Sequence, residues 1–128
     1  MDYKIVSSKN DIDELFNIYF TIIRGSYFIE ALEVFSERNG FVVEYVGVFF
    51  KDGFDVYEKE YEMIKDDQIC ISISTPAIDE NKEAFVNFRD FYLYLKNEAE
   101  NAIVRNSIHE SILRSLLEKV RIALNVDN

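Results

Sequence analysis

Cysteine, proline, glycine and tryptophan are scarce in this 128-residue sequence, which contains one Cys, one Pro, four Gly and no Trp. The single cysteine, Cys70, excludes an intramolecular disulfide, and nothing indicates an oxidising compartment. No segment rich in Pro, Gly or Ser divides the chain, so we expect one domain over residues 1–128. A long apolar run and a basic, apolar signal peptide are also missing, which favours a cytoplasmic protein without a membrane partner.

The usual signatures of catalysis and cofactor binding are absent as well. The sequence has no phosphate-binding glycine loop, no paired-cysteine metal motif and no His-Glu-x-x-His. A hydrolase would have to combine the only histidine, His109, with Cys70 or a serine, and the neighbours of His109 predict a surface position in the first turn of a helix. We therefore predict that the protein is not an enzyme and has no catalytic residue, no cofactor and no metal site.

Negative charge, in contrast, is abundant. The chain has 24 acidic and 14 Lys or Arg residues and a formal net charge of −10. Such a protein repels nucleic acid and anionic lipid and attracts basic surfaces, so we expect no direct nucleic-acid partner. Residues 44–83 contain eleven acids and four bases, so most of the net charge lies in under a third of the chain.

The first half of the chain predicts a helical pair followed by strands. Apolar residues recur at helical spacing over 12–23 and 28–35, as expected for two amphipathic helices. Residues 41–50 are β-branched and aromatic, which predicts one mostly buried strand. A hairpin signal at Lys51-Asp52-Gly53 then predicts a second strand over 54–64.

The second half predicts the last strand and two helices. In residues 68–74 three isoleucines alternate with polar residues and Cys70, as in a strand buried on one face. Thr75-Pro76 would end this strand and begin a loop to Glu83. Helical spacing follows from Phe88, and Ser107-Ile108-His109-Glu110 resembles a capping box that opens a last helix. The expected fold is thus α+β, with a three-stranded antiparallel meander and two C-terminal helices packed on one face of the sheet.

The predicted second strand carries the candidate binding surface. In a strand, Glu58, Glu60 and Glu62 would form one acidic face. An acidic face must meet water or a cationic partner, and a solvated edge that resists aggregation explains it as well as an interface does. Nearby tyrosines favour the interface. The candidate partner-binding residues are Asp55, Tyr57, Glu58, Glu60, Tyr61, Glu62, Asp66 and Asp67.

The same acids offer a metal-binding alternative. Asp11 with Asp13, or the three glutamates of the predicted strand, could ligate Mg²⁺ or Ca²⁺ through oxygen. Acids at a helix start already favour the positive end of the helix dipole, however, and alternate residues of a strand lie about 6.8 Å apart, which is wide for one ion. The spacing argues against a metal role.

Three segments of the chain form a recognisable combination: an acidic Gly-x-x-Val hairpin, here Gly53-Phe54-Asp55-Val56, an Ile-rich strand ending Ile69-Cys70-Ile71-Ser72, and an aromatic helix followed by a Leu-rich one. Together they resemble the immunity proteins of contact-dependent growth inhibition (CDI) systems. The resemblance spans residues 44–124 and departs from the family pattern in the long Thr75–Glu83 loop. The aromatic helix contributes Phe88, Phe91, Tyr92 and Leu95.

This resemblance implies a cytoplasmic protein that neutralises the toxin domain delivered by a neighbouring bacterium. The expected partner is a basic toxin, commonly a nuclease and often an RNase, whose phosphate-binding cleft an acidic protein can occlude. Self-association into a homo-oligomer is compatible with this composition. Two alternatives stay open, an adaptor or subunit that binds another basic host protein and a metal-dependent enzyme that uses the acidic cluster.

Overall fold

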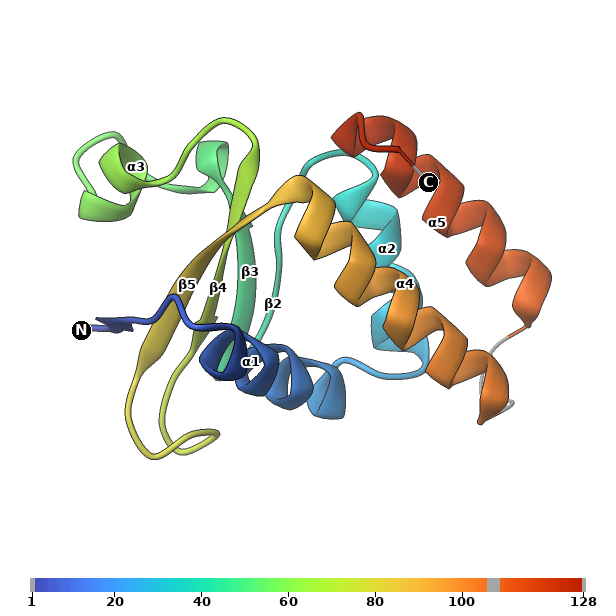
Figure 1. Cartoon of the computed structure of the whole chain (residues 1–128), viewed down its shortest axis with the longest axis horizontal. Coiled ribbons are helices and arrows are strands. Elements are labelled where there is room, and N and C mark those ends of the chain that lie inside the picture. Colours follow the sequence, from blue (N-terminus) through green and yellow to red (C-terminus); the bar gives the residue numbers. More distant parts are fainter. Residues whose placement is uncertain (1, 106–108, 128) are drawn as a thin grey trace.

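Five short strands form one mixed sheet in the computed structural model, which describes residues 2–105 and 109–127 (Figure 1). The spatial order is β1-β5-β4-β3-β2, with β1 parallel to β5 and every other pair antiparallel. The strands β3, β4 and β5 therefore form the centre of the sheet. The bounds are β1 (Lys4–Ile5), β2 (Phe41–Val43), β3 (Val46–Phe50), β4 (Gln68–Ile73) and β5 (Lys82–Asn87).

Four long helices lie where the apolar periodicity predicts them. The side chain of Ser8 accepts a hydrogen bond from the backbone N–H of Asp11 and caps the first of these helices, and the side chain of Asn87 caps the third by accepting a hydrogen bond from the backbone N–H of Asp90. A left-handed Gly25 separates the first two. These helices are α1 (Lys9–Ile22), α2 (Ser26–Phe35), α4 (Phe88–Val104) and α5 (Glu110–Leu124).

One face of the sheet carries the hydrophobic core. Ile69, Ile71 and Ile73 of β4 are fully buried on this face, as their alternation predicts, beneath α1, α2 and α4. The prediction that both C-terminal helices pack on the sheet is wrong for α5. Its apolar stripe, from Leu113 to Leu124, packs against α2 and α4 instead and forms an outer layer.

An aromatic cluster lies at the centre of this core. The ring of Phe91 on α4 is fully buried, and its centroid lies 5.2 Å from that of Phe35, 6.2 Å from Phe16 and 6.3 Å from Phe50. Tilted and edge-on arrangements of this kind add to the free energy gained by burial. Phe91 thus joins α1, α2, α4 and β3.

The predicted single strand over residues 41–50 is two strands, β2 and β3. Glu44, at φ 50°, and Tyr45 form a turn between them, and Phe41 pairs with Val48 in the resulting hairpin. A left-handed backbone is uncommon for a residue with a side chain, so the sequence offered little sign of this turn.

The predicted strand over residues 54–64 is wrong. The chain forms a 3₁₀ turn, η1 (Lys51–Gly53), and a short helix, α3 (Lys59–Met63). Asp55 accepts a hydrogen bond from the backbone N–H of Tyr57, and Glu58 accepts one from the N–H of Asp55. Because these local bonds satisfy the backbone, they replace the ladder that a strand would need.

The third strand of the predicted meander is present as β4, but its neighbour β5 was not expected. β5 begins at Lys82, inside the predicted Thr75–Glu83 loop, and pairs with β4 along its whole length. Of the predicted capping box, Ser107 and Ile108 lie outside the described residues. The helix α5 begins at Glu110 with His109 as N-cap, whose side chain makes no capping hydrogen bond.

Candidate functional site

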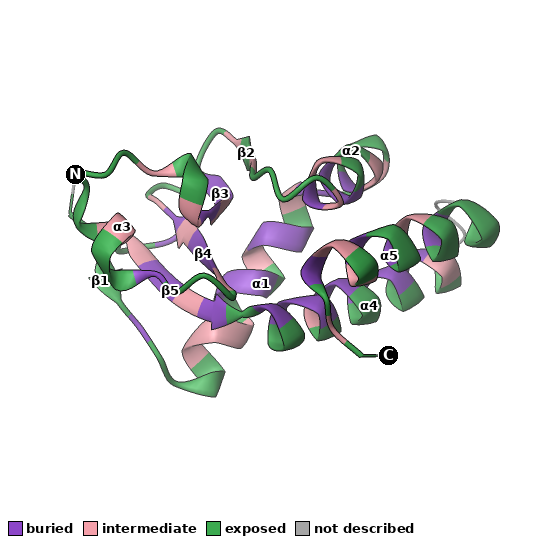
Figure 2. Ribbon diagram, turned by 90° about the horizontal axis from the view of Figure 1, so that it is seen from above, coloured by how far each residue is buried: buried purple, intermediate pink, exposed green. Residues whose placement is uncertain are grey.

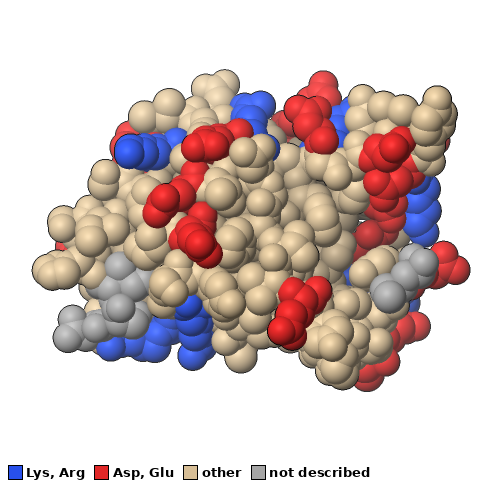
Figure 3. Space-filling model, turned by 180° about the vertical axis from the view of Figure 1, so that it is seen from behind, with Lys and Arg blue, Asp and Glu red and all other residues tan. Residues whose placement is uncertain are grey.

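Residues 51–67, here called the acidic lobe, lie on the side of the sheet away from the long helices (Figure 1). The lobe contains seven acids and three lysines. Its helix α3 has no buried residue, in contrast to the helices of the core (Figure 2). Seen from behind, acidic side chains gather on the side of the molecule that carries the lobe, at the right of Figure 3.

The lobe also exposes large apolar side chains. The side chain of Tyr57 is 94% exposed, and those of Val56 and Met63 are 56% and 44% exposed. Exposed aromatic and apolar groups within a charged surface are typical of protein interfaces. The lobe therefore combines a charge that attracts basic proteins with apolar groups that can be buried on contact.

The eight predicted binding residues all lie in the lobe, but they do not form an acidic strand face. In α3, positions two residues apart point in different directions, so Glu60 turns toward the sheet and is partly buried while Glu58 and Glu62 stay exposed. Tyr61 is partly buried, with the ammonium group of Lys51 5.0 Å from its ring centroid. The other four, Asp55, Tyr57, Asp66 and Asp67, are exposed.

A pocket of about 350 Å³ lies between the lobe and the sheet. Three residues paired across the central strands, Gly47, Ser72 and Glu83, lie along its floor, and the first two are too small to fill it. A Cβ atom at position 47 would lie 3.0 Å from the Phe49 ring, so glycine keeps this floor open. The walls include Tyr3, Glu44, Tyr45, Phe49, Phe54, Glu58 and Glu60.

Glu83 is the unusual residue of this pocket, and the sequence analysis missed it. Its side chain is only 2% exposed, and its Oε1 atom has no hydrogen-bond donor among the residues that the structure describes. The carboxyl group of Glu60 lies within hydrogen-bonding reach, and two carboxyl groups can bond each other only if one is protonated. Burial first, and then the charge of Glu60, raise the pKa of Glu83 to about 7. Only the pairing of β5 with β4 places Glu83 on this floor, so the sequence alone did not single it out.

Cys70 lies beneath the same pocket. Its thiol is buried, 3.7 Å from the Ser72 hydroxyl and 3.8 Å from Oε2 of Glu83. Burial first, and then the carboxylate of Glu83, raise the pKa of the Cys70 thiol well above its ordinary value. A thiol of this kind stays protonated at neutral pH and is a poor nucleophile.

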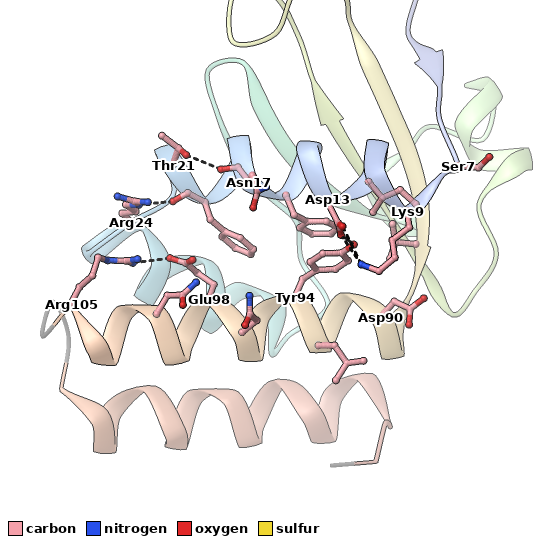
Figure 4. A pocket seen from close by; sticks show the side chains of 17 residues that line it. Ser7, Lys9, Asp13, Asn17, Thr21, Arg24, Asp90, Tyr94, Glu98 and Arg105 are labelled. Atoms are coloured by element: carbon pink, nitrogen blue, oxygen red, sulfur yellow. Dashed lines mark hydrogen bonds and ion pairs between the residues drawn. The ribbon is translucent and has the colours of Figure 1, made fainter.

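A second and larger hollow, of about 1010 Å³, lies between α1 and α4 (Figure 4). Four of its charged side chains form two pairs, Lys9 with Asp13 and Arg105 with Glu98. Asp13 accepts hydrogen bonds from Tyr94 and Lys9, which lower the pKa of Asp13, and Arg105 binds the buried Glu98 at 2.8 Å. Arg24 donates to the carbonyl of Phe20 and Asp90 bonds Asn87, so this groove carries equal numbers of acidic and basic side chains and has no excess negative charge.

Within residues 2–105 and 109–127, no three His, Cys, Asp or Glu side chains are grouped so that they could hold a metal ion. Asp11 lies at the start of α1, and Asp13 binds Lys9 and Tyr94. In the same part of the chain no helix has the length and apolar character needed to cross a membrane.

Comparison with known families gives a match to the CDI immunity protein family over residues 12–117. The chain belongs to this family. The expected resemblance is thereby confirmed, and this immunity protein acts against a cognate CDI toxin, which is its partner. Neutralising a toxin is a binding role. Searches among curated proteins and among solved structures gave no significant match.

The buried carboxyl group of this immunity protein gives a prediction for stability. Because the pKa of Glu83 is higher in the folded protein, folding takes up a proton between about pH 4.5 and 7, and stability falls as pH rises through that range. We expect Glu83→Gln to raise the free energy of unfolding by about 1–2 kcal/mol at pH 8 and to change it little near pH 4.5. Urea unfolding at both pH values would measure this. Glu62→Gln, at an exposed position, should change the free energy of unfolding equally little at both pH values. A Glu83→Gln protein that is less stable than wild type at pH 8 would refute the prediction.

Proposed function

We propose that the acidic lobe is the surface with which this immunity protein binds its toxin, and that the toxin domain is a basic nuclease, an RNase being the type we expect. The observation that carries the proposal is the almost fully exposed ring of Tyr57 among seven acids. A side chain of that size loses much water-exposed area on contact, and the surrounding carboxylates select a basic surface. The toxin would meet its substrate in the cytoplasm, where we expect the immunity protein to act.

A nuclease needs a basic cleft to hold the phosphates of its substrate, and this requirement explains an acidic inhibitor. The lobe can place carboxylates where phosphates would bind and so compete with RNA. Opposite charge also speeds the encounter of the two proteins, and this acceleration decreases as salt rises. Neither effect requires a cofactor or a chemical step.

Co-expression with the neighbouring toxin gene tests the proposal directly. A stable one-to-one complex should form, the isolated toxin domain should cleave RNA, and addition of the immunity protein should stop cleavage. Protection of the lobe from amide hydrogen exchange in the complex would place the contact. A toxin without nuclease activity, or protection confined to α2 and α5, would overturn the corresponding half of the proposal.

Tyr57→Ala should weaken toxin binding by about 10- to 100-fold, because truncation of a central aromatic anchor commonly costs about 2 kcal/mol or more. The melting temperature should stay the same, since the ring is 94% exposed in the free protein. Val104→Ala is the matched control, because Val104 is 85% exposed at the end of α4. Calorimetric titration of the toxin into each variant would compare the contribution of Tyr57 to binding with that of Val104. Equal affinities of the two variants would exclude Tyr57 as an anchor.

A further inference from the structure

The pocket between the acidic lobe and the sheet holds two carboxyl groups that share no cation. Oε1 of Glu83 is buried without a donor from the described part of the chain, and the carboxyl group of Glu60 is a neighbour of the Glu83 carboxyl. The two closest lysines in the sequence do not neutralise them. Lys82 binds Glu14 on α1 at 3.6 Å, and Lys59 is exposed, forms no ion pair within the described residues and acts on Glu83 only through its charge, which lowers the pKa of Glu83. In the free protein a proton on one carboxyl group lets the pair coexist, and a cationic group that enters the pocket from another molecule could take the place of that proton.

The pocket has the shape and walls of a receptor for one long side chain. Its floor is held open by Gly47 and Ser72, and its volume is about 350 Å³. The rings of Phe49 and Phe54, whose centroids lie 5.2 Å apart, and the ring of Tyr45 supply aromatic surface at the wall. Carboxylates beside aromatic rings match the planar guanidinium group, which binds carboxylate with two parallel hydrogen bonds and stacks on rings.

We propose that this pocket receives the guanidinium group of an arginine side chain of the toxin, which pairs with Glu83 and Glu60. The inference rests on the proposed function, because it requires the toxin to lie against the acidic lobe. Arginine is favoured over lysine, since a compact ammonium cannot use the aromatic wall and two carboxyl groups together. A metal ion is disfavoured, because no third carboxylate, Cys or His joins the pair to form a metal site within the described residues.

Arrival of the arginine should expel a proton. The groups that act on Glu83 are Glu60 and Lys59 from α3 and Cys70 from β4, and the other titratable residues that line the pocket are Tyr3, Glu44, Tyr45 and Glu58. Burial and Glu60 raise the pKa of Glu83 to about 7, so the free protein holds a proton there at or below neutral pH. A guanidinium favours the ionised form and lowers that pKa. Toxin binding should therefore tighten from pH 6 to pH 8, as the proton no longer has to be displaced.

Calorimetric titration of the purified toxin domain into the immunity protein, in buffers of different ionisation enthalpy, tests this step. Wild type should release about half a proton at pH 7, where Glu83 is about half protonated, and bind more tightly at pH 8 than at pH 6. Glu83→Gln should bind at least about tenfold more weakly at pH 8 and lose most of the proton release. Glu60→Gln should also weaken binding. The control, Glu30→Gln on the exposed side of α2, should change affinity by less than about threefold and keep the proton release.

A probe without the toxin tests the pocket alone. Arginine amide, titrated to tens of millimolar and followed by the backbone amide signals of Gly47 and Ser72, should shift them in wild type and not in Glu83→Gln. Citrulline amide, which has the same shape without the charge, should shift neither.

The two experiments separate the proposals. If Glu83→Gln binds the toxin with wild-type affinity and proton release while Tyr57→Ala fails to bind, the pocket inference is overturned and the lobe remains the interface. If lobe variants bind normally but arginine amide still shifts Gly47 and Ser72, the proposed interface fails and the pocket is only a guanidinium site. No shift at all in wild type would also overturn the pocket inference.

Discussion

Reversing the charge of two lobe residues, Glu62→Lys with Asp67→Lys, is expected to weaken toxin binding by about 100-fold or more at low salt and to leave the melting temperature unchanged. Both side chains are exposed and make no hydrogen bond or ion pair within the described residues, so their replacement removes no intramolecular contact. The change of +4 in one patch slows the steered encounter and sets like charges against a basic partner. Exposed substitutions of this kind usually alter the free energy of unfolding by about 0.5 kcal/mol or less.

The matched control places the same charge change on the opposite side of the molecule. Glu30→Lys with Glu33→Lys alters two exposed glutamates of α2, which covers the other face of the sheet. At 0.15 M salt the Debye length is about 8 Å, so a distant pair should lower the association rate only modestly. Kinetic measurements at low and physiological salt would compare the variants. Equal losses in both would mean that net charge alone drives binding, and the lobe would no longer be the assigned interface.

The long helices were predictable because their signal is local and repeated. Apolar residues every three or four positions define the buried face of α1, α2 and α4, and polar caps such as Ser8 and Asn87 mark two of their starts. For the same reason, the alternation of residues 68–74 predicted both the strand β4 and which of its faces is buried in the core. The place of α5 in the fold could not be predicted in this way. Periodicity shows that a helix has a buried face, but it does not show which neighbouring layer covers that face.

The lobe was mistaken for a strand because alternation of charge and tyrosine over residues 57–62 has the period of a strand. The deciding interactions are short-range bonds from Asp55 and Glu58 to the backbone, which give the chain turns in place of a ladder. The eight candidate residues still proved to be neighbours, because they are close in sequence. Their geometry was wrong, since a helix separates Glu60 from Glu58 and Glu62.

Glu83 could not be recognised as a site residue without the sheet. A charged residue near Pro76 and Asp79 is typical of a loop, and only the pairing of β5 with β4 places Glu83 across from Ser72. Its partner Glu60 is 23 positions earlier in the chain and comes from a segment that was assigned the wrong structure. Pockets formed between distant segments depend on tertiary packing, which a single sequence reveals only in part.

Truncation of Phe91, at the centre of the core, should cause a large loss of stability. Phe91→Ala should lower the free energy of unfolding by about 3–5 kcal/mol, because it removes a fully buried ring that contacts Phe16, Phe35 and Phe50. A domain of this size has a stability of about 5–15 kcal/mol, so the variant should fold but melt at a much lower temperature. Leu93→Ala, two residues away and 51% exposed, is the control and should cost little.

The affinity of Phe91→Ala for the toxin shows whether a substitution in the core affects stability alone or affects binding as well. Phe91 packs under the isoleucine face of the sheet, whereas the lobe and the Glu83 pocket lie on the other face. At a temperature where the variant is fully folded, its affinity for the toxin should stay within about threefold of wild type, because distant sites act nearly independently. Urea unfolding and calorimetric titration of the same sample would measure both quantities. A large loss of affinity in a folded Phe91→Ala protein would mean that the helical face, or a rearrangement transmitted through it, takes part in toxin binding.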